Sequence, residues 1–291
     1  MKVDLNKFRD VSNTHASLAQ FYRWFQVYER PLNETRFRNQ LDMLADEVHI
    51  ESMAGKHIGR EGLWERLSAF DGWQNAHHVK KTVVAPVDED TMSVEADLLY
   101  QNIRPDGTRY SYTIHYVTRL DLRENELPLF SSVVIKATGN IDHPLFEDAY
   151  IENRARSFMH YWCWNIETAN GNAGRFRELL ADEFELHLSS DGIVNSFEQV
   201  EDWINSTPGR IKMSAHYPKN FSFKENEDHT IAVSVDFEWR AISADGKEIV
   251  AETHHKWTLV NNPDERFARM KNMRIDQVKA LEVVKPWGLK L

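Results

Sequence analysis

The sequence predicts an α+β protein made of two tandem copies of one domain, each a curved antiparallel sheet packed on helices. Three observations lead to this fold class. The chain has 291 residues, enough for two domains at roughly 150 residues per domain. A series of residues recurs at one fixed offset along the chain. Each copy begins with aromatic-rich helical stretches and continues with long segments that alternate between hydrophobic and polar residues.

The internal repeat is carried by identities at a single spacing. Segment 75–81 (NAHHVKK) corresponds to 214–220 (SAHYPKN), so that His216 follows His77 by 139 positions. The same offset relates further pairs: Trp64 and Trp203, Lys80 and Lys219, Asp97 and Asp236, His115 and His254. Identities in the same order at one spacing indicate a duplication. We therefore predict domains at residues 1–145 and 146–291, joined by the turn-forming segment 139–144.

Three helices are expected in each copy. The first is the aromatic-rich stretch 17–29 in copy one, which Pro31 ends, and 151–167 in copy two. A short second helix is expected to begin at an asparagine cap, Asn33 or Asn172, and to run to a LADE motif. The acids of this motif are expected at the helix end and the following turn. A third helix carries Trp64 or Trp203.

Strand signals fill the rest of each copy. Residues 48–51 and 184–187 alternate as strands do. Three or four long strands follow the third helix. In the second of these, four hydrophobic residues share one face: Val94, Ala96, Leu98 and Tyr100 in copy one, and Val233, Val235, Phe237 and Trp239 in copy two. The glycine-containing segments 105–107 and 244–246 predict hairpin turns.

Composition limits the classes of function. The formal net charge is -10 and no basic run occurs, which disfavours binding to nucleic acid or to an anionic membrane. Cys163 is the single cysteine, which excludes an intrachain disulfide and a thiolate metal cluster. We expect no metal and no cofactor, because neither a metal-ligating spacing nor a Gly-rich phosphate loop occurs. The polar N-terminus and the lack of a long apolar run predict a cytoplasmic protein.

Each copy resembles the NTF2-like superfamily, and within it the SnoaL-like proteins. The resemblance rests on LADEVHIESMAG and LADEFELHLSSDG, on the helix after each, and on the strand openings AHHVKKTVV and AHYPKNFSF. It implies a cone-shaped fold whose sheet surrounds a pocket closed by helices. The superfamily contains polyketide cyclases, ketosteroid isomerase, scytalone dehydratase and proteins that only bind, so the fold does not settle the function.

The resemblance also implies candidate catalytic residues. The strand opening is similar to the scytalone dehydratase segment that supplies a catalytic histidine, which places His77 and His216 at that position. Histidine suits proton transfer because its unperturbed pKa lies near neutrality. The aspartate of that enzyme would fall near Asn33 and Asn172, which cannot act as bases. Both histidines are therefore either pocket acids or bases, or structural residues that bond to the backbone.

A ligand pocket is expected beside the first helix of each copy, because this helix lines the pocket in the superfamily. Its aromatic walls suit a planar or cyclic hydrophobic ligand. The ligand-binding candidates are Tyr22, Trp24, Glu51 and Ser52 in copy one and Tyr161, Trp164 and His187 in copy two. Leu188 replaces Ser52 in copy two, so copy one is expected to have the more polar pocket.

Three functions remain open. The first is a protein that binds a hydrophobic small molecule. The second is a SnoaL-like lyase or isomerase, of the dehydratase or cyclase type, with His77 as acid or base. The third is a non-catalytic interaction subunit. The two copies are expected to pack sheet to sheet as an intrachain pseudo-dimer, with four polar residues at or near the contact: Asp97, His115, Asp236 and His254. Association of whole chains stays open.

Overall fold

The computed structural model describes residues 6–141, 145–189 and 192–283, which group into two compact units. The N-terminal unit contains Asn13–His160 and Asn262–Phe267, and the C-terminal unit contains Tyr161–Asn261 with residues 268–283 and 6–12. One short segment late in the chain therefore belongs to the N-terminal unit. The domain limits predicted from the repeat, 1–145 and 146–291, stay a prediction, and the predicted linker lies partly outside the described residues.

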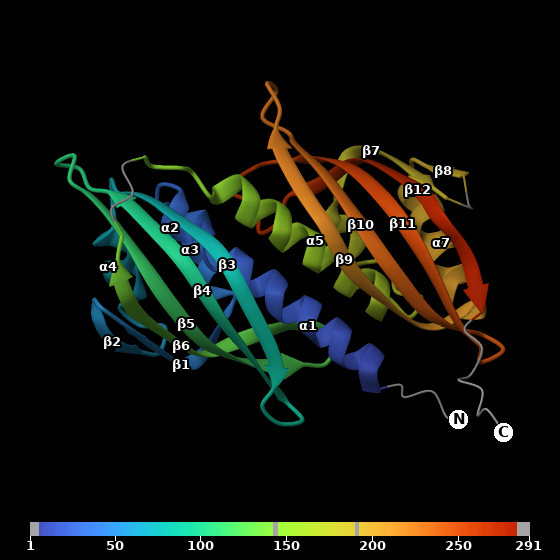
Figure 1. Cartoon of the computed structure of the whole chain (residues 1–291), viewed down its shortest axis with the longest axis horizontal. Helices are drawn as coiled ribbons and strands as arrows, with labels where there is room; N and C mark the ends of the chain where they lie inside the picture. Colours follow the sequence, from blue (N-terminus) through green and yellow to red (C-terminus); the bar gives the residue numbers. More distant parts are fainter. Residues whose placement is uncertain (1–5, 142–144, 190–191, 284–291) are drawn as a thin grey trace. The chain divides into compact units, whose positions relative to one another are not determined.

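The N-terminal unit is a six-stranded sheet with helices against one face (Figure 1). Its helices are α1 (Asn6–Arg23, from Asn13 onward), α2 (Gln26–Glu29), α3 (Glu34–Leu41), α4 (Leu63–Ser68) and the start of α5 (Tyr150–Thr168). Its strands are β1 (Leu44–Ser52), β2 (Gly55–Ile58), β3 (Gln74–Pro86), β4 (Thr91–Ile103), β5 (Arg109–Arg123) and β6 (Glu126–Asn140). The strands lie in the order β2-β1-β6-β5-β4-β3.

The C-terminal unit repeats this arrangement, with the sheet order β8-β7-β12-β11-β10-β9. Its helices are the end of α5, α6 (Phe176–Leu179), α7 (Phe197–Ser206) and the 3-10 turn η1 (Thr207–Gly209). Its strands are β7 (Leu180–Leu188), β8 (Gly192–Val194), β9 (Ile211–Glu225), β10 (Ile231–Ser243), β11 (Glu248–Val260) and β12 (Arg269–Val283). None of the described helices combines the length and the apolar character that crossing a membrane requires.

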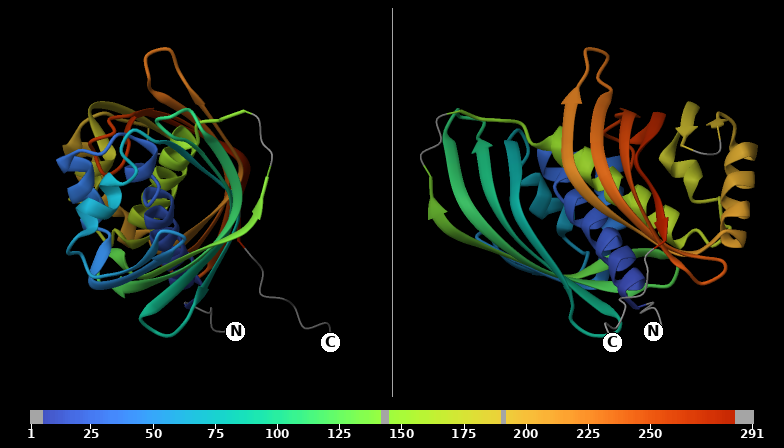
Figure 2. Two further views of the ribbon diagram at one scale, coloured as in Figure 1. Left: turned by 90° about the vertical axis from the view of Figure 1, so that its left-hand side faces the viewer. Right: turned by 45° about the vertical axis from the view of Figure 1, so that its right-hand side comes forward.

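The predicted α+β fold class is confirmed, with one correction to the sheets. Most strand pairs are antiparallel, but β1 pairs with β6 and β7 pairs with β12 in parallel. Each sheet is therefore mixed, because the first strand of a unit runs in the same direction as the last. Figure 2 shows the long strands β3–β6 curved around the helices of their unit. This is the architecture that the resemblance to NTF2-like proteins implies.

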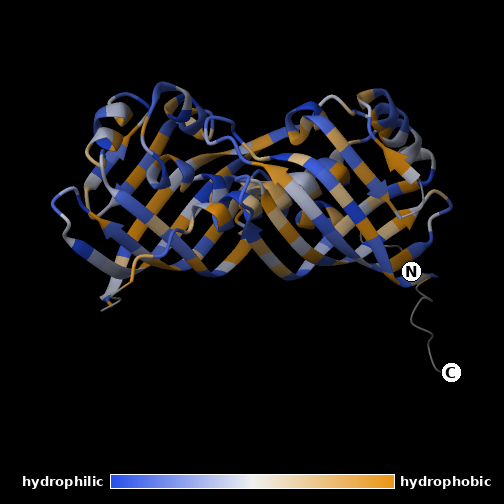
Figure 3. Cartoon of the chain, turned by 90° about the horizontal axis from the view of Figure 1, so that it is seen from above, coloured by the Kyte–Doolittle hydropathy of each residue, from blue (hydrophilic) through white to orange (hydrophobic). Residues whose placement is uncertain are grey.

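Hydrophobic residues at alternate positions of the strands form the core of the N-terminal unit. Val94, Ala96 and Leu98 of β4 are no more than 2% exposed. They pack with Phe21 of α1 and Phe25, which follows that helix. Figure 3 shows the same alternation of hydrophobic and hydrophilic residues along the long strands of the chain. Burial of this apolar face holds the helices against the sheet.

Two expected elements have different limits in the structure. The first helix begins at Asn6 rather than near residue 17, and a break after Arg23 separates α1 from α2. The LADE segments are not a helix end and a turn, because Leu44 begins β1 and Leu180 begins β7. Pairing of β1 with β6 is irregular between Leu44 and His49, and the acids of the motif face outward there.

Asn33 caps α3 as expected, whereas Asn172 caps no helix. The side-chain oxygen of Asn33 accepts a hydrogen bond from the backbone N–H of Arg36 at 2.8 Å. In copy two, α6 starts only at Phe176, and the oxygen of Asn172 accepts from the backbone of Gly174 within the preceding loop. Local bonding in that loop replaces the capping geometry.

The contrast between the two asparagines predicts unequal effects on stability. Asn33→Ala is expected to lower the free energy of unfolding by about 1 kcal/mol, because a first-turn N–H of α3 loses its acceptor. Asn172→Ala serves as the matched control and is expected to cost less than about 0.5 kcal/mol. Urea unfolding followed by circular dichroism measures both values. Equal losses for the two variants would contradict this interpretation of the cap.

Candidate functional site

A cavity of about 370 Å³ lies within the N-terminal unit. Its wall is formed by α2, the β1–β2 turn, α4 and the segment after it, and strands β3 to β6. Six aromatic residues line it: Tyr28, Phe70, Trp73, Tyr100, Tyr112 and Tyr116. Six polar or charged residues also line it: Ser52, Arg66, Asn75, His77, Asn102 and Arg104. The site thus combines flat hydrophobic walls with a few polar groups, as small-molecule sites do.

His77, near the start of β3, is bonded to a buried carboxylate. Oε1 of Glu29, the last residue of α2, accepts the backbone N–H of His77 at 2.8 Å and lies 3.1 Å from His77 Nδ1. Because Oε1 acts as an acceptor toward the backbone, it also accepts from the ring, and Nδ1 carries the hydrogen. In the neutral ring, Nε2 is then the nitrogen without a hydrogen, which is the form a general base requires.

A residue of α5 holds the carboxylate in place. Nδ2 of Asn153 donates to both oxygens of Glu29, at 3.0 and 3.2 Å, and lies 3.0 Å from the backbone oxygen of His77. The side chain of Glu29 has no exposed surface. A buried carboxylate needs such donors, since burial without them is costly. Asn153 therefore ties Glu29 and His77 into one rigid group.

Aromatic rings fix the orientation of the imidazole. The His77 ring stacks on Phe25 with centroids 4.7 Å apart and contacts Tyr100 at 4.9 Å. The hydroxyl of Tyr100 donates to Asn75 Oδ1 at 2.7 Å, and Asn75 Nδ2 donates to the backbone oxygen of Tyr28. Burial raises the pKa of Tyr100 to about 12 and also raises the pKa of Tyr28. Both phenols therefore stay protonated near neutral pH and can serve as hydrogen-bond donors.

The C-terminal unit repeats the histidine–glutamate pair in a different setting. Oε1 of Glu167 accepts the backbone N–H of His216 at 2.7 Å and lies 3.1 Å from His216 Nδ1. Burial lowers the pKa of His216 to about 4. Its ring meets the edge of Phe237, which in turn contacts His255 and Trp257. At the repeat offset, Phe237 and Trp257 correspond to the smaller Leu98 and Thr118 of copy one.

Three of the four ligand-binding candidates in copy one lie away from the cavity. Tyr22 stacks on His160, and Trp24 is 1% exposed and packs against Phe130 in the core. Glu51 is exposed and pairs with Lys56 at 3.2 Å, so it does not line the cavity either. Ser52 does line it, as does His77.

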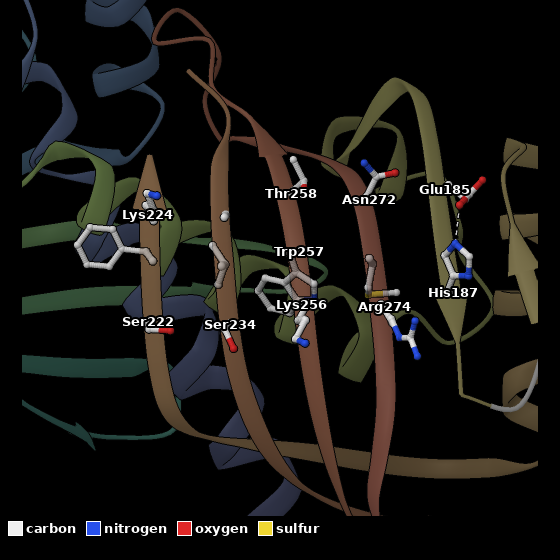
Figure 4. A pocket seen from close by; sticks show the side chains of 14 residues that line it. Glu185, His187, Ser222, Lys224, Ser234, Lys256, Trp257, Thr258, Asn272 and Arg274 are labelled. Carbon is white, nitrogen blue, oxygen red and sulfur yellow. Dashed lines mark hydrogen bonds and ion pairs between the residues drawn. The ribbon is translucent and has the colours of Figure 1, made fainter. Parts of the chain in front are cut away.

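The candidates in copy two are spread over two places. Tyr161 and Trp164 are buried in α5, where their rings stack and the Tyr161 hydroxyl donates to Glu178 at 2.9 Å. His187 lies instead on the outer face of the C-terminal sheet, with Nε2 2.5 Å from Glu185 Oε1. These side chains border a surface hollow of about 560 Å³ with Lys256 and Arg274 (Figure 4). The structure therefore does not gather the three copy-two candidates into one site.

The polar residues expected near a contact between the copies form one histidine–aspartate pair in each sheet. His115 Nδ1 lies 2.7 Å from Asp97 Oδ1, and His254 Nδ1 lies 2.6 Å from Asp236 Oδ1. Each pair joins two neighbouring strands directly across the ladder. Their role in a contact between the copies stays a prediction.

Sequence reasoning missed the acidic partner of each histidine. It considered Asn33 and Asn172 for that position, but the partners are Glu29 and Glu167, one residue type at the end of the aromatic helical stretch in both copies. The available signal was this recurrence, since each glutamate precedes the strand opening by a similar length of chain. Arg66 and Arg104 were missed because no motif of the resemblance includes them.

The similarity of this chain to known proteins is a similarity to solved structures. No protein-family model matches the chain, and no curated protein matches it. A hexachlorocyclohexane dehydrochlorinase (LinA) type 2 is similar at 10% identity, over 47% of this chain and 95% of that chain, with a TM-score of 0.41. Aln2 from a Streptomyces species is similar at 17% identity, over 46% and 94% of the two chains, with a TM-score of 0.39. A putative scytalone dehydratase from Novosphingobium aromaticivorans is similar at 11% identity, over 50% and 93%, with a TM-score of 0.37.

Proposed function

We propose that the N-terminal unit binds a small cyclic hydrophobic molecule and that His77 moves a proton to or from it, as a cofactor-independent lyase or isomerase would. One observation carries the proposal: His77 lines an aromatic cavity while its Nδ1 is held by the buried carboxylate of Glu29. The pairing directs the other ring nitrogen, Nε2, to act as the base.

The proposed reaction begins with removal of a proton from a carbon next to a carbonyl group. His77 Nε2 accepts the proton, and the negative charge of Glu29 stabilises the imidazolium that forms. A base of this kind contributes about 100-fold to 10,000-fold in rate. The electron pair moves to the carbonyl oxygen, where a cavity donor such as the Tyr28 hydroxyl stabilises the oxyanion.

Binding without turnover is the second candidate function. The same pair recurs at His216 and Glu167, and in both copies the glutamate also accepts the backbone N–H of its histidine. This bond fixes the start of a strand, which is a structural role that needs no substrate. An experiment must therefore separate occupancy of the cavity from proton transfer.

Deuterium exchange of 2-tetralone separates the two functions. Its C–H groups beside the carbonyl exchange in D₂O when a base removes a proton, and NMR measures both this exchange and binding of the compound. We expect the protein to accelerate exchange and His77→Gln to lower the protein-dependent rate by about 100-fold or more, with binding retained. His216→Gln is the matched control from the other copy and is expected to keep the rate.

The variant Glu29→Gln tests the role of the carboxylate. It retains the size of the side chain but removes the charge that stabilises the imidazolium, so we expect a loss of about 10-fold to 100-fold in exchange rate at nearly constant affinity. Binding of 2-tetralone without any His77-dependent exchange would support the binding function and overturn the catalytic one.

A further inference from the structure

Two arginines line the same cavity, and no ion pair among the described residues neutralises them. Arg66 of α4 donates to Ser52 Oγ at 2.7 Å and lies 3.4 Å from the backbone oxygen of Gly55. The guanidinium of Arg104 lies over the rings of Trp73 and Tyr110, at 4.8 and 4.4 Å from their centroids. Its buried Nε has no hydrogen-bond partner among the described residues.

The charge balance of the cavity is therefore positive. Of the described residues that line it, none is acidic. Glu29 lies behind His77 and is occupied by that residue and by Asn153. The chain as a whole carries a net charge of -10, so a cationic cavity is a local departure from its overall charge. Positive charge within aromatic walls is costly unless an anion offsets it.

The repeat shows that the fold does not require these arginines. At the repeat offset, Arg66 corresponds to Asn205 and Arg104 corresponds to Ser243. The C-terminal unit builds the same helix, the same strand ladder and the same histidine–glutamate pair without either charge. The two arginines thus occur together in the copy that has the aromatic cavity around its histidine.

We propose that the ligand of this cavity is a cyclic hydrophobic carboxylate, with its carboxylate group bound by Arg66 and Arg104. The planar fork of a guanidinium matches the two oxygens of a carboxylate, and stacking on Trp73 and Tyr110 holds the Arg104 fork in one plane. The aromatic walls bind the ring of the ligand. Oδ1 of Asn102, buried in the wall and without a hydrogen-bond partner among the described residues, accepts from a ligand hydroxyl.

This inference rests on the proposed function for the location of the ligand, and it adds the class of compound. The arginines anchor the charged end, so that the uncharged ring is presented to His77. Binding of the carboxylate does not itself involve a proton transfer. The two claims can therefore fail separately.

A matched pair of probes tests the inference on the full chain. 2-Naphthoate and 2-naphthamide have the same ring system and differ in charge, and isothermal titration calorimetry measures the affinity of each. We expect 2-naphthoate to bind at least about tenfold more tightly, because hydrogen bonds to charged groups are the stronger ones. The preference should fall as salt is raised, since the anion is bound partly by charge.

Substitution then assigns the preference to the two residues. Arg66→Gln and Arg104→Gln are each expected to lower the affinity for 2-naphthoate by about tenfold and to leave that for 2-naphthamide nearly unchanged. Arg66→Lys and Arg104→Lys retain the charge and should keep part of the preference. They therefore distinguish a loss of charge from a loss of folding in the glutamine variants. Arg38→Gln, at an exposed position of α3, is the control and should have no effect.

Each outcome bears on one claim. Equal affinity for the two probes in the unmodified protein, or a preference that persists in both glutamine variants, would overturn the carboxylate inference. The same holds if 2-tetralone binds and neither naphthalene probe does. A preference that depends on the arginines in a protein that shows no His77-dependent exchange would support the inference and overturn the catalytic proposal.

Discussion

Replacing Arg154 by methionine is expected to lower the free energy of unfolding by about 4 kcal/mol. Arg154 of α5 is fully buried. Its Nη1 donates to Gln26 Oε1 at 2.7 Å and to the backbone oxygens of Glu265 and Arg266, each at 2.9 Å, and Nη2 donates to that of Asn262 at 2.8 Å. Methionine fills most of the space but leaves these acceptors unpaired in the interior.

Arg156 provides the control for this prediction, two residues further along the same helix. It pairs with Glu152 at 2.8 Å, and both side chains are partly exposed. Arg156→Met should therefore cost less than about 1 kcal/mol. Urea unfolding at neutral pH measures both variants. Similar losses at the two positions would mean that the bonds of Arg154 do not hold the late segment of the chain in place.

Acid is expected to destabilise the protein through His255. Burial, together with the smaller effect of the neighbouring His216, lowers the pKa of this residue to about 3. An unfolded histidine titrates near pH 6.5, so between about pH 6.5 and about pH 3 the unfolded chain binds a proton that the folded chain does not. The contribution of His255 to the free energy of unfolding is then fully present above about pH 6.5. It is lost as the pH decreases, by roughly 1.4 kcal/mol for each unit of difference between the unfolded and the folded pKa.

Removing the titrating group should flatten this pH dependence. His255→Phe keeps an aromatic ring among Phe237 and Trp257, and its free energy of unfolding should change less between about pH 7 and about pH 4.5 than that of the unmodified protein. His229→Gln alters an exposed histidine and should leave the dependence unchanged. An unaltered slope for His255→Phe would show that other groups cause the loss of stability in acid.

Most of the fold was predictable because its signals are local or periodic. Alternation in 94–100 placed Leu98 on the core face, and Gly107 in the predicted hairpin adopts a φ of 83°, which few other residues tolerate. The direction of β1 was not predictable from such signals. Whether Ile50 pairs in parallel with Val133 of β6 depends on contacts far apart in the sequence.

The candidate site was predictable only in part, for the same reason. His77 was identified because the strand opening in which it lies is a recognisable motif, and Ser52 because it lies within the recognisable segment LADEVHIESMAG. Glu29 and the two arginines lie on separate elements, and only the tertiary fold brings them to one cavity. Tyr22 and Trp24 were assigned to the pocket from their helix alone, but the direction in which each residue of a helix points depends on its rotation against the sheet.

The membership of residues 262–267 in the N-terminal unit sets the order in which a ribosome can complete that unit. Its last strand, β6, ends at Asn140, yet the carbonyl groups that bond to Arg154 are made only after β11. Vectorial synthesis normally lets an N-terminal domain fold before the next one emerges. Here the nascent N-terminal unit must wait, with Arg154 lacking these acceptors, until most of the second copy has been translated. Completion of the N-terminal unit thus depends on synthesis of the second copy.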